Sequence, residues 1–278
     1  MTEDNFQDWI GRTETAEEKV TQRVVSAFNA TFDRDPPPAG APAPLGIHWC
    51  LASATVKASA LGQDGHPARG NFFPHVPLPR RMWAGGALIL HDELLVGDKI
   101  TRHSKIAAVT MKHGRTGALC FVAVDHEYFS PRGLAIAERQ DIVYRPAQNP
   151  AAAGPPPVPQ QTEAAPAWRR DMRTDPVTLF RYSALTFNGH RIHYDLPYAT
   201  QVESYPGLVV HGPLQATLLL AFAADCAARR PQNFTFRGLT PLTDPDPFTL
   251  NARPVEGGLE LWVETGTGRR TMQALAGF

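Results

Sequence analysis

The chain has 278 residues, 43% of them hydrophobic and 19% charged, and Lys plus Arg and Asp plus Glu each number 27. A formal net charge of zero argues against nucleic acid or an anionic membrane as a partner recognised by bulk charge. The cysteines, Cys50, Cys120 and Cys226, have no paired spacing, which is typical of a reducing compartment and argues against a cysteine zinc site.

The chain also lacks the signals of export. Its first residues, MTEDNFQDWIGRTETAEEK, are acidic and polar, unlike a signal peptide. The longest strongly apolar run, Leu214 to Ala224, is too short to cross a bilayer. We therefore expect a cytoplasmic protein with no membrane partner.

Proline-rich segments divide the chain. An N-terminal helix is predicted over Thr15 to Phe32, where apolar residues share one face. Residues 146–168 read PAQNPAAAGPPPVPQQTEAAPAW, a composition typical of an extended linker. We therefore predict an N-terminal domain over 1–147, a linker over 148–166 and a C-terminal domain over 167–278.

Each half contains an antiparallel meander. Residues 86–129 alternate apolar and polar side chains, with breaks at Gly97-Asp98 and at 113–117, which predicts three strands. Residues 234–278 show the same pattern, with turns near 244–247, 256–258 and 266–269. The two stretches align by eye as a weak internal repeat.

A helix is predicted that begins at Pro213, a residue suited to the first helical position, and has no breaker from Gln215 to Arg229. Its residues are apolar almost all round, so the helix must be enclosed. The economical enclosure is a curved antiparallel sheet wrapped around it. We therefore predict an α+β fold, a double hot dog with two such units in one chain.

Between the linker and this helix lies TFNGHRIHYDLPYA, residues 186–199. We predict a strand over Leu179 to Thr186, a turn at 188–190, and a short helix near 196–202 capped by Asp195. His193 then lies on a loop entering a helix. A histidine suits proton transfer, and a helix N-terminus suits a developing oxyanion.

The segments FNGHRIHYDLPYA and YPGLVVHGPLQATLL together resemble the MaoC-like hydratases and dehydratases. The longer context resembles the double hot dog branch with mesaconyl-C4-CoA hydratases, itaconyl-CoA hydratases and 3-hydroxyacyl-thioester dehydratases type 2. The resemblance covers roughly 14–146 and 178–278. It implies reversible addition of water to an α,β-unsaturated acyl-CoA by a carbon-oxygen lyase.

Residue by residue, His193 matches the catalytic histidine of the family motif D-x-N-P-[IL]-H-x-D. Asp195 matches the second aspartate, and either orients His193 or caps the helix. Gly212 matches the glycine whose N–H faces the thioester oxygen. Asn188 replaces the first aspartate, so the second acid–base group is open; its amide can hold the water or fix the imidazole tautomer.

Four residues are candidates for substrate contact. His190, where the motif has asparagine, is either a second acid–base group or a turn residue. Arg191, where the motif has proline, can bind the free carboxylate of a mesaconyl or itaconyl group, or pair with a surface aspartate. Arg81 is an alternative contact for carboxylate or CoA phosphates, and His211 stands beside Gly212.

No metal or cofactor is predicted beyond the CoA of the substrate. His190 and His193 could bind a metal only with a third ligand from elsewhere, and His66, like the other histidines, has no ligand-like neighbours in the sequence. The N-terminal half lacks the motif, so we expect it to supply groove but no chemistry.

Other functions remain open at this point. A 3-hydroxyacyl-thioester dehydratase of fatty acid metabolism fits the same motif. A thioesterase would normally place a carboxylate on the central helix, where this chain has Gln215. An inactive acyl-CoA-binding subunit would account for Asn188. Open sheet edges favour a homodimer.

Overall fold

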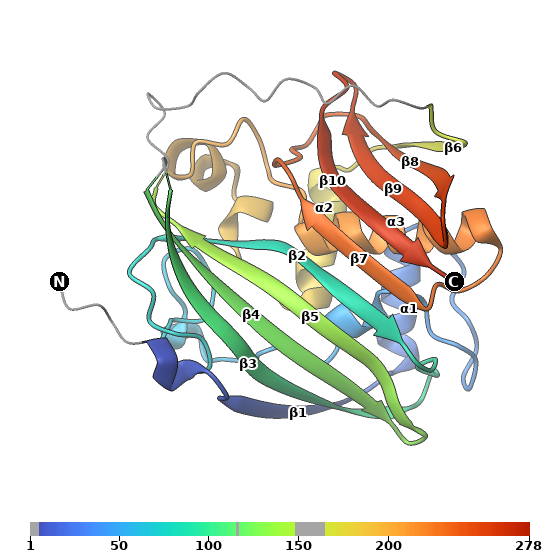
Figure 1. Ribbon diagram of the computed structural model, residues 1–278, viewed down its shortest axis with the longest axis horizontal. Helices are drawn as coiled ribbons and strands as arrows, with labels where there is room; N and C mark the ends of the chain where they lie inside the picture. Colours follow the sequence, from blue (N-terminus) through green and yellow to red (C-terminus); the bar gives the residue numbers. More distant parts are fainter. Residues whose placement is uncertain (1–5, 115–116, 148–164) are drawn as a thin grey trace.

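The computed structural model describes residues 6–114, 117–147 and 165–278, in which ten strands form one antiparallel sheet (Figure 1). The N-terminal half contributes β1 (Thr13–Lys19), β2 (Arg80–Leu90), β3 (Lys99–Gly114), β4 (Gly117–Ser130) and β5 (Gly133–Arg145). The C-terminal half contributes β6 (Trp168–Met172), β7 (Asn233–Gly238), β8 (Phe248–Val255), β9 (Gly258–Thr265) and β10 (Arg270–Gly277). The α-helices are α1 (Gln22–Thr31), α2 (Pro176–Thr186) and α3 (Gly212–Ala227).

The strand order, β1-β3-β4-β5-β2-β7-β10-β9-β8-β6, repeats one topology twice. In each half the meander's first strand pairs with its fourth, the fourth with the third and the third with the second, and an extra strand covers the outer edge. The halves join where β2 pairs with β7, side by side in the middle of Figure 1. The predicted meanders and their repetition are thus confirmed, with β5 added to the first. The predicted linker falls almost wholly on residues 148–164, outside the described residues.

Helix α3 is the buried helix predicted from its apolar composition. It packs against β8, β9 and β10 and also touches β2 and β7. Leu218, Leu219 and Leu220 are consecutive and all buried, which only an element enclosed on every side permits. The helix starts at Gly212, one residue before the predicted first position at Pro213, with His211 as its N-cap, and it ends at Ala227.

The predicted N-terminal helix is wrong over its first residues. Thr13–Lys19 form the edge strand β1, paired with β3 from Thr13–Lys105 to Lys19–Lys99. The helix is only Gln22–Thr31, with the Thr21 hydroxyl accepting the Val24 N–H at 3.2 Å. The outer edge of β3 offers unpaired backbone groups, and their hydrogen bonds outweigh the helix propensity of Ala16 to Lys19.

The strand predicted at Leu179 to Thr186 is also wrong, because these residues belong to α2. Asp175 caps this helix by accepting the Thr178 N–H at 2.7 Å, and Pro176 opens it. The buried residues Leu179, Tyr182 and Ser183 follow helical spacing, at intervals of three and four. Asp175-Pro176 is a helix-start signal, so the sequence itself indicates a helix here.

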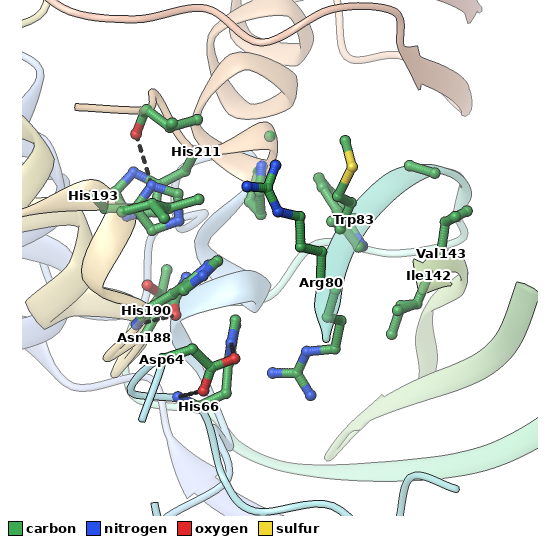
Figure 2. A pocket seen from close by; sticks show the side chains of 18 of the residues that line it. Asp64, His66, Arg80, Trp83, Ile142, Val143, Asn188, His190, His193 and His211 are labelled. Carbon is green, nitrogen blue, oxygen red and sulfur yellow. Dashed lines mark hydrogen bonds and ion pairs between the residues drawn. The ribbon is translucent and has the colours of Figure 1, made fainter. Parts of the chain in front are cut away.

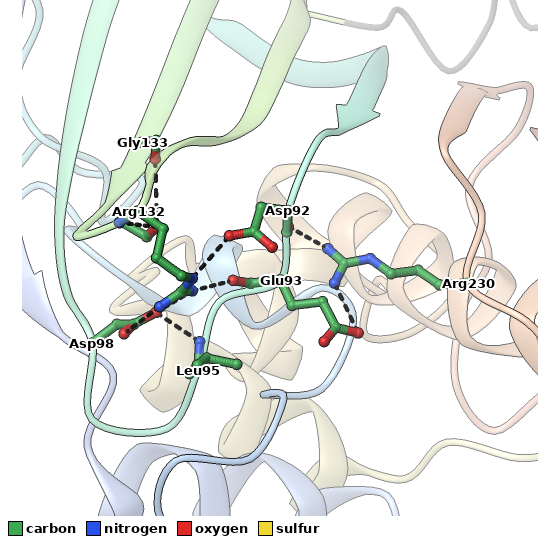
Figure 3. A network of polar contacts seen from close by, with 8 residues as sticks. Asp92, Glu93, Leu95, Asp98, Arg132, Gly133 and Arg230 are labelled. Carbon is green, nitrogen blue, oxygen red and sulfur yellow. Dashed lines mark hydrogen bonds and ion pairs between the residues drawn. The ribbon is translucent and has the colours of Figure 1, made fainter.

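A polar network ties the two halves at the far end of the sheet (Figure 3). Arg132, in the turn between β4 and β5, donates to Asp92 at 2.9 Å and to both carboxylate oxygens of Asp98. Arg230, which follows α3, donates to the Asp92 carbonyl at 2.9 Å and pairs with Glu93. The loop between β2 and β3 is thereby held to the C-terminal half.

Among the described helices, none is both long and apolar enough to span a membrane.

Candidate active site

A cavity of about 770 Å³ lies between the halves, beneath the N-terminus of α3. In the described part of the chain its lining includes four histidines, His66, His190, His193 and His211, and four arginines, Arg69, Arg80, Arg81 and Arg145. Trp49, Trp83, Phe72 and Phe73 add apolar rings. The mixture of imidazoles, cations and rings suits an anionic organic molecule that undergoes proton transfer.

His193 ends a 3-10 helix, η5 (Arg191–His193), and is buried. Its Nδ1 lies 2.7 Å from the carbonyl oxygen of Val209. A carbonyl oxygen can only accept, so Nδ1 carries the hydrogen and Nε2 holds the lone pair. The Val209 N–H in turn donates to the Ile192 carbonyl at 2.9 Å, which fixes the backbone on both sides. His193 lies just before a helix, as predicted, and its side chain lines the cavity (Figure 2).

His211 and Gly212 begin α3 at the same end of the cavity. The His211 ring stacks on that of His193, with centroids 3.6 Å apart, and its Nε2 lies 2.8 Å from the Ser183 hydroxyl. The first amides of a helix have no intrahelical acceptor, so the Gly212 N–H is available to an oxygen in the cavity. A Cβ on Gly212 would lie 3.2 Å from Trp83, so glycine lets α3 approach β2 closely.

Asn188 and His190 also line the cavity. The Asn188 side-chain oxygen accepts the His190 backbone N–H at 3.0 Å, so it holds the turn. The His190 ring is buried and lies 5.4 Å from that of His193. Thus the two residues share the site with His193, but the site takes no carboxylate from this segment.

The structure places Arg191 and Asp195 outside the cavity lining, paired with each other at 2.8 Å. Arg191 also stacks over Tyr198 and donates to the Gln63 carbonyl at 3.1 Å. Asp195 accepts the Tyr198 N–H at 3.1 Å at the start of η6 (Tyr198–Val202), a π-helix. Asp195 therefore caps a helix, as one of its two predicted roles required, while Val209 orients His193.

Arg81, on β2, lines the cavity together with the histidines. Its guanidinium lies 5.5 Å above the Phe73 ring. Burial lowers the pKa of His66, and the charge of Arg81 lowers it further. Burial and the imidazoles of His66 and His193 lower the pKa of His190, and Arg81 adds to them. Arg81 is therefore the predicted substrate-binding cation that the structure brings to the imidazoles.

Two residues of the N-terminal half were missed. His66 lies in the cavity wall, with its Nδ1 3.0 Å from the Asp64 carboxylate and its ring 4.1 Å from that of His190. The expectation that His66 lacks such neighbours is wrong: Asp64 stands two residues before it in the chain, and His190 comes from a distant segment. Asp64, His66 and His190 offer three ligand atoms within 4.8 Å of one another. A metal-free site stays a prediction.

The buried histidines are neutral at pH 7. Burial lowers the pKa of His193 and of His48 to about 3, and burial together with Arg81 lowers that of His66 to about 4. In an unfolded chain a histidine has a pKa of about 6.5. Between about pH 6.5 and 4 the unfolded chain therefore binds protons that the folded chain does not.

We expect the free energy of unfolding to fall as the pH falls through this window. Each histidine that stays neutral contributes a loss of up to about 1.4 kcal/mol per pH unit. Denaturant unfolding at pH 7 and pH 5 measures the difference. Most carboxylates titrate below this window, so equal stability at the two pH values would contradict the burial of neutral imidazoles.

Comparison with known proteins agrees with the geometry. The family model for hydroxyacyl-thioester dehydratase type 2 matches residues 46–244. The chain is 42% identical to a mesaconyl-C(4)-CoA hydratase of Chloroflexus aurantiacus, over 99% of this chain and 98% of that one. Solved structures with the same fold include HtdX of Mycobacterium tuberculosis, at TM-score 0.69 and 19% identity, covering 96% of this chain and 100% of that chain.

Another Mycobacterium tuberculosis protein, described as a double hot dog, matches at TM-score 0.59 and 14% identity, over 96% of this chain and 95% of that one. The predicted α+β double hot dog is therefore confirmed. With a matching family model and a relative aligned over its whole length, the chain belongs to the hydroxyacyl-thioester dehydratase type 2 family.

Proposed function

We propose that this protein adds water reversibly to an α,β-unsaturated acyl-CoA, and that the acyl group is a branched C5 dicarboxylyl group, mesaconyl-C4 or itaconyl. One observation carries the reaction type: His193 and Gly212, the first residue of α3, line the same cavity. A base and an oxyanion donor are the two groups that conjugate addition to a thioester needs.

The steps follow from these positions. The His193 Nε2 takes a proton from water as the water oxygen bonds to the β-carbon. The electron pair of the double bond moves toward the thioester oxygen, where the Gly212 N–H stabilises the enolate charge. The imidazolium then returns its proton to the α-carbon and the thioester carbonyl re-forms. This addition of water needs no cofactor or metal.

The cations of the cavity support the dicarboxylyl substrate. In a mesaconyl-C4 group the free carboxylate is attached to the carbon that water attacks, so its partner must lie near the base. Arg81 lines the same cavity as His193, and its charge acts on the neighbouring imidazoles of His66 and His190. The 42% identity to a mesaconyl-C(4)-CoA hydratase favours the same substrate.

Replacing Arg81 by glutamine is expected to lower kcat/KM for mesaconyl-C4-CoA about 10–100-fold, because a hydrogen bond to a charged group is worth about 1.5–3 kcal/mol. For crotonyl-CoA, which has no free carboxylate, the change should be several-fold at most. Arg139→Gln is the matched control, since Arg139 pairs with Asp141 outside the cavity lining. An equal loss with both substrates would assign Arg81 to CoA or to the fold.

The second candidate is a dehydratase of 3-hydroxyacyl thioesters in fatty acid metabolism, which the family model supports. Parallel assays with mesaconyl-C4-CoA, itaconyl-CoA and crotonyl-CoA separate the two. Preference for a dicarboxylyl substrate supports the proposal, whereas turnover of crotonyl-CoA alone would replace it by the second candidate. A thioesterase is less well supported, because α3 has Gln215 in place of a carboxylate, and its side-chain oxygen accepts from the Thr271 hydroxyl at 2.7 Å. An inactive acyl-CoA-binding subunit is less well supported, because His193 and Gly212 both line the cavity.

We further propose that the protein acts in the cytoplasm as a homodimer, with an acyl-CoA substrate and no nucleic acid or membrane partner. The outer edges of β1 and β6 have no strand beyond them in the described residues, and open edges favour pairing between copies. Sedimentation of the purified protein tests the dimer; a monomer at micromolar concentration would exclude it.

A further inference from the structure

The loop that carries Asp64 and His66 is held in shape by hydrogen bonds of its own. Leu61 and Pro67 form an isolated β-bridge, and the Gly62 N–H donates to the His66 carbonyl at 2.8 Å. The Asp64 carboxylate accepts the His66 backbone N–H at 3.0 Å. The loop is thus a closed turn, and its two functional side chains have a fixed relative position.

This turn lies directly on the motif segment of the other half. The Arg191 N–H donates to the Asp64 carbonyl at 2.9 Å. A Cβ on Gly65 would lie 1.9 Å from the Gly189 carbonyl oxygen, and a Cβ on Gly189 would lie 2.7 Å from that of Gly65. Gly65 also has φ of +86°, which favours glycine. Two glycines therefore permit the contact that brings His66 to the cavity.

The Asp64 carboxylate sets the tautomer of His66. An ionised carboxylate can only accept, and hydrogen bonding to His66 helps to hold the pKa of Asp64 well below its usual range. The His66 Nδ1 therefore carries the hydrogen of the 3.0 Å bond, and Nε2 holds a lone pair. His66 and His193 thus each have an Nε2 that can accept, and Figure 2 shows both, with His190 between them.

We infer that His66 is a second catalytic residue, which accepts a hydrogen bond from the attacking water, and that Asp64 is its positioning residue. The inference rests on the proposed hydration. With one hydrogen accepted by His193 and the other by His66, the water directs a lone pair at the β-carbon. No proton is transferred to His66. The N-terminal half thereby supplies the second acceptor that Asn188 cannot supply as a carboxylate.

His190 is less suited to this role. Its ring has no hydrogen-bond partner within the described ranges, so nothing fixes its tautomer. Its ring lies 4.1 Å from that of His66 and 5.4 Å from that of His193, so it packs against both. A metal ion on Asp64, His66 and His190 that took the His66 Nδ1 would displace the hydrogen bond to Asp64. A metal site is therefore included in the test.

The test compares His66→Ala, His66→Gln and Asp64→Asn with the wild type in the hydration of mesaconyl-C4-CoA. We expect His66→Ala to lower kcat about 100-fold, as loss of a water-positioning group does, with KM changed less than about threefold. Glutamine has a side-chain oxygen that can accept, so His66→Gln should retain more activity than His66→Ala. Asp64→Asn should lose about tenfold, because the amide no longer enforces the tautomer. Added imidazole should partly restore His66→Ala.

His75→Ala is the matched control, because His75 is an exposed histidine of the same region outside the cavity lining. Thermal melting shows whether each variant folds. An active wild type with His66→Ala within threefold of it would overturn the inference and leave the hydratase intact. A wild type that is inactive with this substrate would instead contradict the proposed function. Activity lost with a chelator and restored by Zn²⁺ alone would overturn the inference in favour of a metal site.

Discussion

Replacing His193 by alanine is expected to lower kcat for hydration by about 10²–10⁴-fold, the usual contribution of a general base. The lone pair of its Nε2 is directed into the cavity because Val209 accepts from Nδ1. Alanine removes the base, while the Gly212 N–H and the cations of the cavity still bind the substrate. We therefore expect KM to change much less than kcat.

The measurement is the initial rate of loss of the enoyl-thioester absorbance with mesaconyl-C4-CoA at saturating concentration. His103→Ala is the control. His103 is an exposed residue of β3 that hydrogen-bonds Thr15 of the edge strand β1, and it lies outside the cavity lining. Because His193 packs on His211 at 3.6 Å, each variant is first checked by thermal melting. A folded His193→Ala enzyme with kcat within tenfold of wild type would remove His193 from the role of base.

The second large effect is expected at Gly212, and a pair of variants isolates its N–H. Gly212→Ala and Gly212→Pro both add a Cβ, which an ideal geometry places 3.2 Å from Trp83, but only proline removes the amide hydrogen. Proline is tolerated in the first helical turn. We expect kcat of the proline variant to be about 10²–10³-fold below that of the alanine variant, the usual cost of losing one oxyanion donor.

The same absorbance assay measures both variants, and the comparison between them cancels the strain against Trp83. If both variants lose activity equally, the close approach of α3 to β2 matters and the N–H does not. That outcome would place the thioester oxygen elsewhere in the cavity.

Much of the fold could be predicted from local pattern. A long apolar run without breakers predicts the buried helix α3, and the alternation of apolar and polar residues predicts the strands of the meanders. The strand β1 could not be separated from the helix that follows it, because its hydrogen bonds go to β3, 80 or more residues away in the chain. Helix α2 was predictable from Asp175-Pro176, whose cap is local.

Some residues of the site could likewise be predicted from local pattern, and others could not. The motif residues His193 and Gly212 were found because a spaced pattern contains them. Arg191 and Asp195 are four residues apart and have opposite charges, a spacing that favours an ion pair. The structure shows this ion pair. Asp64 and His66 could not be found, because only the contact between Gly65 and Gly189 brings them to the cavity. The sequence around them, QDGHPARG, places Asp64 two residues before His66, but it shows neither His190 nor the contact with the motif segment.

The most direct measurement follows two signals at once when purified protein meets mesaconyl-C4-CoA: the enoyl-thioester absorbance and the release of free thiol. Water addition removes the absorbance and leaves CoA attached, so we expect fast loss of the band with no thiol released. Release of thiol at the rate of band loss would mean that the thioester is hydrolysed, and it would contradict the assignment of this cavity to hydration.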